Sequence, residues 1–67
     1  MQAREIRTWT SDEIQDRLSD AYREFFALRR QLVMSRLEDH SRVKAVKRDI
    51  ARMKTILRER ELVEEVA

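Results

Sequence analysis

Seven basic residues and a single acid lie between residues 42 and 58, and these side chains are the ones best suited to a chemical task. The bases are Arg42, Lys44, Lys47, Arg48, Arg52, Lys54 and Arg58, and the acid is Asp49. Lysine and arginine neutralise phosphates and release the counterions around a nucleic acid. A solvated helix face held by ion pairs would need acids interleaved with the bases. The segment therefore predicts phosphate binding, without distinguishing RNA from DNA.

Most of these bases follow one flank of a predicted helix, beside the apolar position Ile50. The bases on this flank are Lys44, Lys47, Lys54 and Arg58. Arg48 extends the flank outward, and Ala51 lies in its middle. A small side chain at that point would let a phosphate backbone approach closely, so the flank predicts a stripe for backbone binding.

The other polar residues form no catalytic or metal-binding pattern. The chain has no Cys and no Gly, which excludes thiolate chemistry and glycine-rich phosphate loops. His40 is the single histidine, and one histidine makes neither a triad nor a metal site. Ser11, Ser35 and Ser41 have no base beside them. We predict no enzyme activity, no cofactor, no metal and no small-molecule substrate.

The elements that must position these residues are helical, because the 67-residue chain has no Gly or Pro and is 42% charged. Apolar residues spaced three and four apart form two heptad seams. The seams are Ile14, Leu18, Ala21, Phe25, Leu28 and Leu32, and then Val43, Val46, Ile50, Met53 and Leu57. These patterns predict an all-α fold with one domain over residues 1–67. It is an antiparallel two-helix hairpin, with long helices at about 10–35 and 39–61 and a short N-terminal helix.

The helix ends have their own signals. Thr10 and Glu13 are spaced as a capping box, and Trp9 and Ile14 as a hydrophobic staple. We interpret Trp9 as this staple rather than as a platform for bases. Asp39 is the expected N-cap of the second long helix, and the acidic tail after residue 61 is expected to fray. No apolar run is long enough to predict a membrane span.

A second apolar stripe lies beside the first seam, at Tyr22, Phe26 and Val33. A two-helix hairpin cannot bury all of it. The stripe is either a widened edge of the core or a docking face for protein or RNA, and we interpret it as a protein-partner face.

Residues 47–57 (Lys-Arg-Asp-Ile-Ala-Arg-Met-Lys-Thr-Ile-Leu) resemble the signature of the bacterial-type family of large-subunit ribosomal protein twenty-nine. Residues 4–7 and 10–14 resemble the family's opening, and residues 28–32 and 37–39 resemble its mid-helix motif and turn. The resemblance covers residues 2–61 without a gap.

The resemblance implies a non-catalytic protein of the cytoplasmic ribosome. It implies a helical hairpin bound to large-subunit ribosomal RNA near the exit of the polypeptide tunnel. The implied protein neighbours are ribosomal protein twenty-three and factors that meet nascent chains. Carried over by motif, the RNA-facing residues are Lys47, Arg48, Arg52 and Lys54, with Arg29 and Gln31 as secondary candidates.

The chain departs from the family pattern at two positions. Ser35 stands where the family usually has Gly in the turn, and Arg30 stands where an apolar or aromatic residue is common. Two other functions stay open: a coiled-coil adaptor with protein partners only, and a dimeric DNA-binding helix protein. The single-sign stripe over residues 42–58 argues against the adaptor, and two seams that pair within one chain argue against the dimer.

Overall fold

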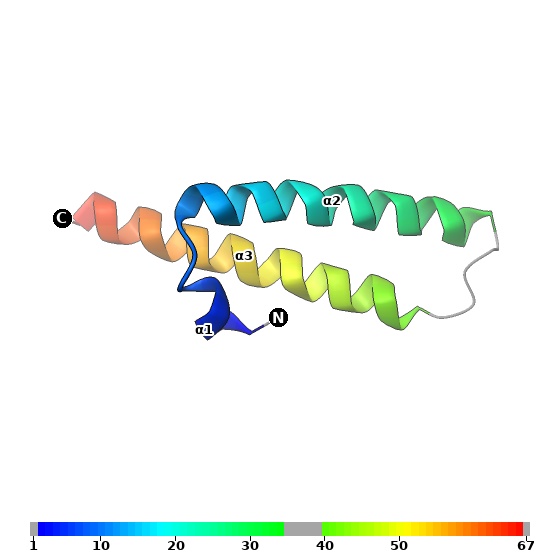
Figure 1. The fold of residues 1–67 in the computed structure, drawn as a ribbon, viewed down its shortest axis with the longest axis horizontal. Coiled ribbons are helices and arrows are strands. Elements are labelled where there is room, and N and C mark those ends of the chain that lie inside the picture. Colours follow the sequence, from blue (N-terminus) through cyan, green and yellow to red (C-terminus); the bar gives the residue numbers. More distant parts are fainter. Residues whose placement is uncertain (1, 35–39, 67) are drawn as a thin grey trace.

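Helices and short non-helical segments make up the part of the chain that the structure describes. The structure is a computed structural model, and it describes residues 2–34 and 40–66. Helix α1 covers Ala3–Ile6, α2 covers Ser11–Val33 and α3 covers Ser41–Val66. Helices α2 and α3 run antiparallel in a rod that measures 49 × 17 × 17 Å, and α1 lies against α3 (Figure 1). The predicted all-α hairpin with a short N-terminal helix is confirmed.

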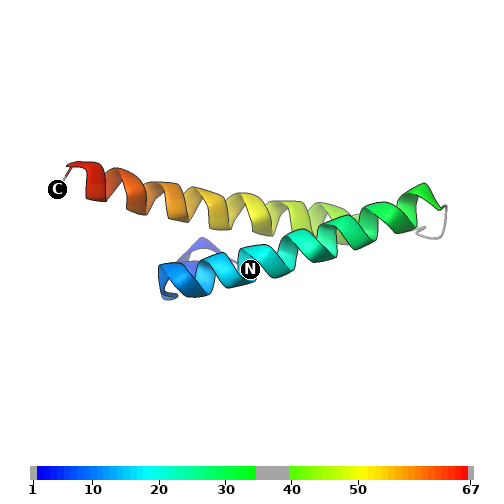
Figure 2. The same ribbon diagram turned by 90° about the horizontal axis from the view of Figure 1, so that it is seen from above.

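The two long helices stay beside each other in a view turned by 90° (Figure 2). Their apolar seams therefore face one another within a single chain, which is what the hairpin prediction requires. None of the helices in residues 2–34 and 40–66 is long and apolar enough to cross a membrane.

Helix α2 begins at the predicted capping box. The Oγ1 atom of Thr10 accepts a hydrogen bond from the backbone N–H of Glu13 at 3.1 Å. The carboxylate of Glu13 accepts in return from the backbone N–H of Thr10 at 3.4 Å. Trp9 packs on the core cluster that contains Ile14, so the staple is confirmed as well. Two of the free N–H groups at the helix start are thereby satisfied.

The end of α3 differs from the prediction. The helix continues to Val66, past the expected end at residue 61, and whether its last turns fray stays a prediction. The segment after residue 61 has no Gly or Pro to stop a helix. Arg58 donates to Glu61 at 2.9 Å in the turn just before it. The expected turn at Ser35 and cap at Asp39 lie outside the described residues, so the predicted boundaries at 35 and 39 are not tested.

The tightest part of the core lies at the end of the hairpin where α1 docks. Ile6, Ile14 and Met53 are fully buried there, together with Ile56. The seams correctly identified Ile14 and Met53, but they missed Ile6 and Ile56. A two-helix seam accounts for one buried side of α3, whereas α1 covers a second side on which Ile56 lies.

Packing becomes looser toward the turn. Val46 and Ile50 of α3 are buried, but Phe25, Leu28 and Leu32 of α2 are only half-buried. The core side chains of α2 are therefore less buried at the turn end of the hairpin, where α2 ends and α3 begins, than at the end where α1 docks.

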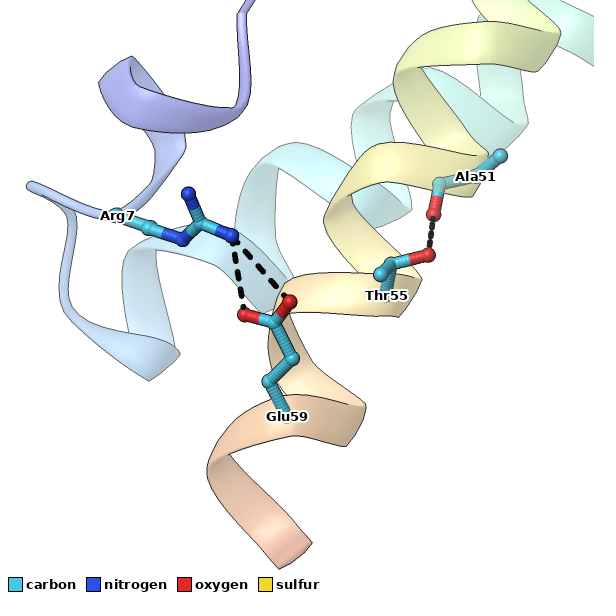
Figure 3. Close-up of polar contacts among 4 residues, drawn as sticks. All are labelled: Arg7, Ala51, Thr55 and Glu59. Atoms are coloured by element: carbon cyan, nitrogen blue, oxygen red, sulfur yellow. Dashed lines mark hydrogen bonds and ion pairs between the residues drawn. The ribbon is translucent and has the colours of Figure 1, made fainter. Parts of the chain in front are cut away.

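Polar contacts also fasten the N-terminal segment to α3. The guanidinium of Arg7 donates to both carboxylate oxygens of Glu59, at 3.3 and 3.4 Å (Figure 3). In the turn of α3 just before this pair, the hydroxyl of Thr55 donates to the carbonyl of Ala51 at 2.8 Å, within the helix (Figure 3). The short helix α1 is thus held by both apolar and ionic contacts.

Candidate nucleic-acid interface

Lys54 of α3 lies over the ring of Tyr22 of α2, so flanks of the two long helices join into one side of the hairpin. The Nζ atom of Lys54 is 5.9 Å from the centre of the ring. Residues seven apart in a helix complete almost two turns and share a side. Lys47 therefore shares the side of Lys54, and Arg29 shares the side of Tyr22. Because the helices are antiparallel, Lys47 and Arg29 lie at about the same level, nearer to the turn.

Phe26 follows Tyr22 by one helical turn and joins this side. Lys44 precedes Lys47 by one turn and lies at the outer border of this side. We call this surface the basic–aromatic face. Its members are Tyr22, Phe26, Arg29, Lys44, Lys47 and Lys54.

The cations of this face carry charge that no carboxylate balances nearby. Lys44, Lys47 and Lys54 are exposed, and none of them forms an ion pair with a residue that the structure describes. The guanidinium of Arg29 lies 5.8 Å from the ring centre of Phe25, and it too has no acidic partner in residues 2–34 and 40–66. An anion that approached this face would meet four exposed cations from two helices.

Arg42 differs from the other bases of the predicted stripe, because it points to the opposite flank and is paired. Its Nε atom donates to the Glu24 carboxylate of α2 at 2.7 Å. Asp49, the one acid of the stripe, lines the same flank beside Asp20. The other two acids that line this flank, Asp20 and Glu24, come from α2, so counting acids within residues 42–58 could not reveal them. The opposite flank is mixed in charge, and the basic–aromatic face is of one sign.

The remaining predicted bases of α3 occupy two other places. Arg48 and Arg52 are exposed on the outer surface of α3, turned away from α2. Arg58 follows Lys54 by one helical turn, but it donates to Glu61 at 2.9 Å. Both partners of that pair are more than half exposed, and such pairs are weak. Arg58 is therefore at the border of the face, with its charge partly balanced.

Gln31 does not join the basic–aromatic face. It follows Arg29 by two residues, which turns its side chain about 200° around α2. The two secondary candidates from the family motif therefore lie on opposite flanks of the helix. A partner bound on the basic–aromatic face would contact Arg29 and not Gln31.

The second apolar stripe of α2 consists of Tyr22, Phe26 and Val33. Two of these residues are too exposed to form an edge of the core. Phe26 is 53% exposed and Val33 is 85% exposed. Tyr22 is half-buried, and its ring stacks on that of Phe26 with centres 6.4 Å apart. The sequence pattern alone indicates a protein-partner face separate from the bases. The structure places Tyr22 and Phe26 among the bases, and the shared heptad spacing of Tyr22 with Arg29 was the signal that could have indicated this.

No group of three His, Cys, Asp or Glu side chains within residues 2–34 and 40–66 is placed to hold a metal ion. His40 is exposed at the start of α3. The hollows between the helices that the described residues line are open surface grooves, and one of them lies near the C-terminal end, beside Leu18, Leu57 and Leu62.

The chain is similar in sequence to proteins of the large ribosomal subunit. The family model described as Ribosomal L29 protein matches residues 4–60. Large ribosomal subunit protein uL29 of Clostridioides difficile is 48% identical over 64 residues, which cover 96% of this chain and 96% of that protein. The uL29 protein of Thermotoga petrophila is 50% identical over 62 residues, or 92% of this chain and 94% of that protein. The uL29 protein of a Thermoanaerobacter species is 52% identical over 62 residues, or 92% of this chain and 90% of that protein.

Proposed function

The chain belongs to the ribosomal L29 protein family, and from this membership we propose that it binds ribosomal RNA through the basic–aromatic face. Relatives that match over almost their whole length are named as proteins of the large ribosomal subunit. The chain is accordingly a structural constituent of that subunit in the cytoplasmic ribosome, and not an enzyme.

The observation that carries the proposal is the set of unpaired cations on one side of the hairpin. Lys44, Lys47 and Lys54 are exposed and have no acidic partner among the described residues. A rigid row of such charges neutralises phosphates and gains free energy from released counterions. RNA helices hide most base edges in a deep, narrow groove, so α3 would contact mainly the backbone. Arg48 and Arg52 on the outer surface of α3, and Arg58 at the border, would contact neighbouring RNA strands.

The finer placement of the protein in the subunit is also part of the proposal. The family resemblance supports a position near the exit of the polypeptide tunnel, beside ribosomal protein twenty-three and within reach of factors that meet nascent chains. Val33 is 85% exposed at the end of α2. Of the three residues predicted as a protein-partner face, we assign Val33 to a contact with a neighbouring protein. Tyr22 and Phe26 lie among the cations and are treated separately below.

The experiment is the salt dependence of binding to fragments of large-subunit ribosomal RNA. The wild-type protein should give a steep slope that reflects about four to six phosphates, at roughly −0.7 to −0.9 per contact. The variant Lys47→Glu/Arg48→Glu should lower the magnitude of the slope by about two and weaken binding strongly, while its helicity by circular dichroism stays unchanged.

A matched control reverses two charges elsewhere. Arg23 and Arg30 are exposed on the side of α2 turned away from α3, so Arg23→Glu/Arg30→Glu makes the same change in net charge. This control should retain most of the wild-type slope. A flat slope for the wild type would favour the adaptor that binds proteins only. Equal losses in the two double variants would mean that RNA is attracted by overall charge and not by this face.

A further inference from the structure

We propose that Phe26 is a stacking platform for an unpaired nucleobase of the RNA. The inference rests on the proposed function, because it assumes that RNA lies along the basic–aromatic face. It adds a base-contacting residue to a surface that otherwise contacts phosphates, and it names the type of RNA element, an unpaired nucleotide in a loop or bulge.

The first observation is that the Phe26 ring is exposed and yet held in place. The ring is 53% exposed, and two other aromatic rings lie beside it. Tyr22 stacks on it with ring centres 6.4 Å apart and planes 22° apart. Phe25 meets it at 5.9 Å with planes 58° apart. A ring supported in this way loses little further freedom when a base settles on it.

The second observation separates Phe26 from the other aromatic rings of the chain. Each of the other three has a cation over it: Arg17 lies 4.0 Å from the ring of Trp9, Arg29 lies 5.8 Å from Phe25, and Lys54 lies 5.9 Å from Tyr22. Among the described residues no cation covers Phe26. Among these four rings, Phe26 is therefore the one whose exposed surface no cation occupies.

The third observation concerns the charge around the ring. The cations over its two aromatic neighbours, Lys54 and Arg29, lie on either side of Phe26 and can hold the phosphates that flank a stacked nucleotide. A protein segment could also cover an exposed ring, but on this face it would have to bring carboxylates to unpaired cations on both helices. RNA supplies phosphates along its whole length, so one partner accounts for the ring and the cations together.

The required RNA element follows from the geometry of RNA. Bases inside an A-form helix are already stacked on each other, so an exposed side chain can stack only on a base that has left the helix. Stacking on an aromatic ring tolerates any base, because every base has a π-face. The platform would therefore recognise the presence of an unpaired nucleotide and not its sequence.

The test uses two RNA stems that differ by one nucleotide. One stem has a single bulged 2-aminopurine, and the other has the same strands fully paired. Wild-type protein should bind the bulged stem about tenfold more tightly and quench the 2-aminopurine fluorescence. The variant Phe26→Leu, which keeps an apolar side chain, should lose both the preference and the quenching, with an unchanged salt slope. Phe26→Tyr should restore both.

Val33→Ala serves as the matched control, because Val33 is an exposed apolar residue seven positions after Phe26 on the same side of α2, but it is not aromatic. It should bind both stems like the wild type. If wild type binds both stems equally with a steep salt slope, the platform is refuted and the phosphate clamp stands. If wild type binds neither stem, the proposed function fails. If Phe26→Leu keeps the preference for the bulge, Phe26 is not the platform.

Discussion

Arg60 of α3 donates a hydrogen bond from Nη2 to the carbonyl oxygen of Trp9 at 2.8 Å, across a separation of 51 residues in the sequence. The same nitrogen reaches the carbonyl of Arg7 at 3.4 Å, and Nη1 donates to the hydroxyl of Ser11 at 2.9 Å. One guanidinium thus ties the C-terminal part of α3 to the connection between α1 and α2.

We expect Arg60→Ala to lower the free energy of unfolding by about 1–3 kcal/mol, because it removes hydrogen bonds of a charged donor and leaves the part-buried carbonyl of Trp9 without its partner. The stability of Arg60→Lys should lie between those of the wild type and Arg60→Ala, since an ammonium cannot make the forked contact of a guanidinium. Urea unfolding followed by circular dichroism measures the change. The single tryptophan, Trp9, reports on the same region by fluorescence. An Arg60→Ala protein as stable as an Arg23→Ala control would contradict this role.

Truncation of core side chains should cost most at the end of the hairpin where α1 docks. Met53 is fully buried, so Met53→Ala should destabilise the protein by about 2–5 kcal/mol. Phe25 is in the seam but only half-buried, so Phe25→Ala should cost less despite the larger side chain. Thermal and urea unfolding of the two variants give the comparison. A larger loss for Phe25→Ala would mean that the two long helices, without α1, form the main core.

Much of this architecture could be predicted from local patterns in the sequence. The Thr10–Glu13 capping box and the two seams depend on spacing within one helix, and they identified the hairpin and its direction. The burial of Ile6 and Ile56 could not be predicted in this way. It arises where the four residues of α1 pack on a second side of α3, and a helix of one turn has no periodic pattern to recognise.

The candidate interface was predictable to a similar extent. The row of bases on α3 is a property of one helix, and the structure keeps Lys44, Lys47 and Lys54 together. The loss of Arg42 from that row depends on Glu24, which belongs to the other helix. Tertiary packing decides which acids face which bases. The sequence pattern alone therefore placed Arg42 among the bases of the predicted stripe.

The Arg42–Glu24 pair should contribute little to stability and nothing to RNA binding. Both side chains are substantially exposed, so a double-mutant cycle with Arg42→Gln and Glu24→Gln should give a coupling of about 0.2–1 kcal/mol. In the salt titration with ribosomal RNA fragments, Lys47→Gln should lower the magnitude of the slope by about one contact, and Arg42→Gln should leave it nearly unchanged. Equal effects of the two substitutions would show that Arg42 leaves Glu24 to bind phosphate.

The uneven packing predicts uneven local stability in the free protein. Amide hydrogens near Leu28 and Leu32, where α2 is only half-buried, should exchange with solvent at least about tenfold faster than those near Ile14, where α1 completes the core. Hydrogen exchange measured residue by residue by NMR tests this. Added ribosomal RNA should slow exchange most at the turn end, because Phe26, Arg29 and Lys47 lie there and RNA would replace the packing that α2 lacks. Uniform protection along α2 in the free protein would contradict the prediction, since it would mean that half-buried seam residues alone hold the helix as firmly as the three-helix end does. Exchange that RNA slows only near Ile14 would place the partner at the other end of the hairpin, away from the basic–aromatic face.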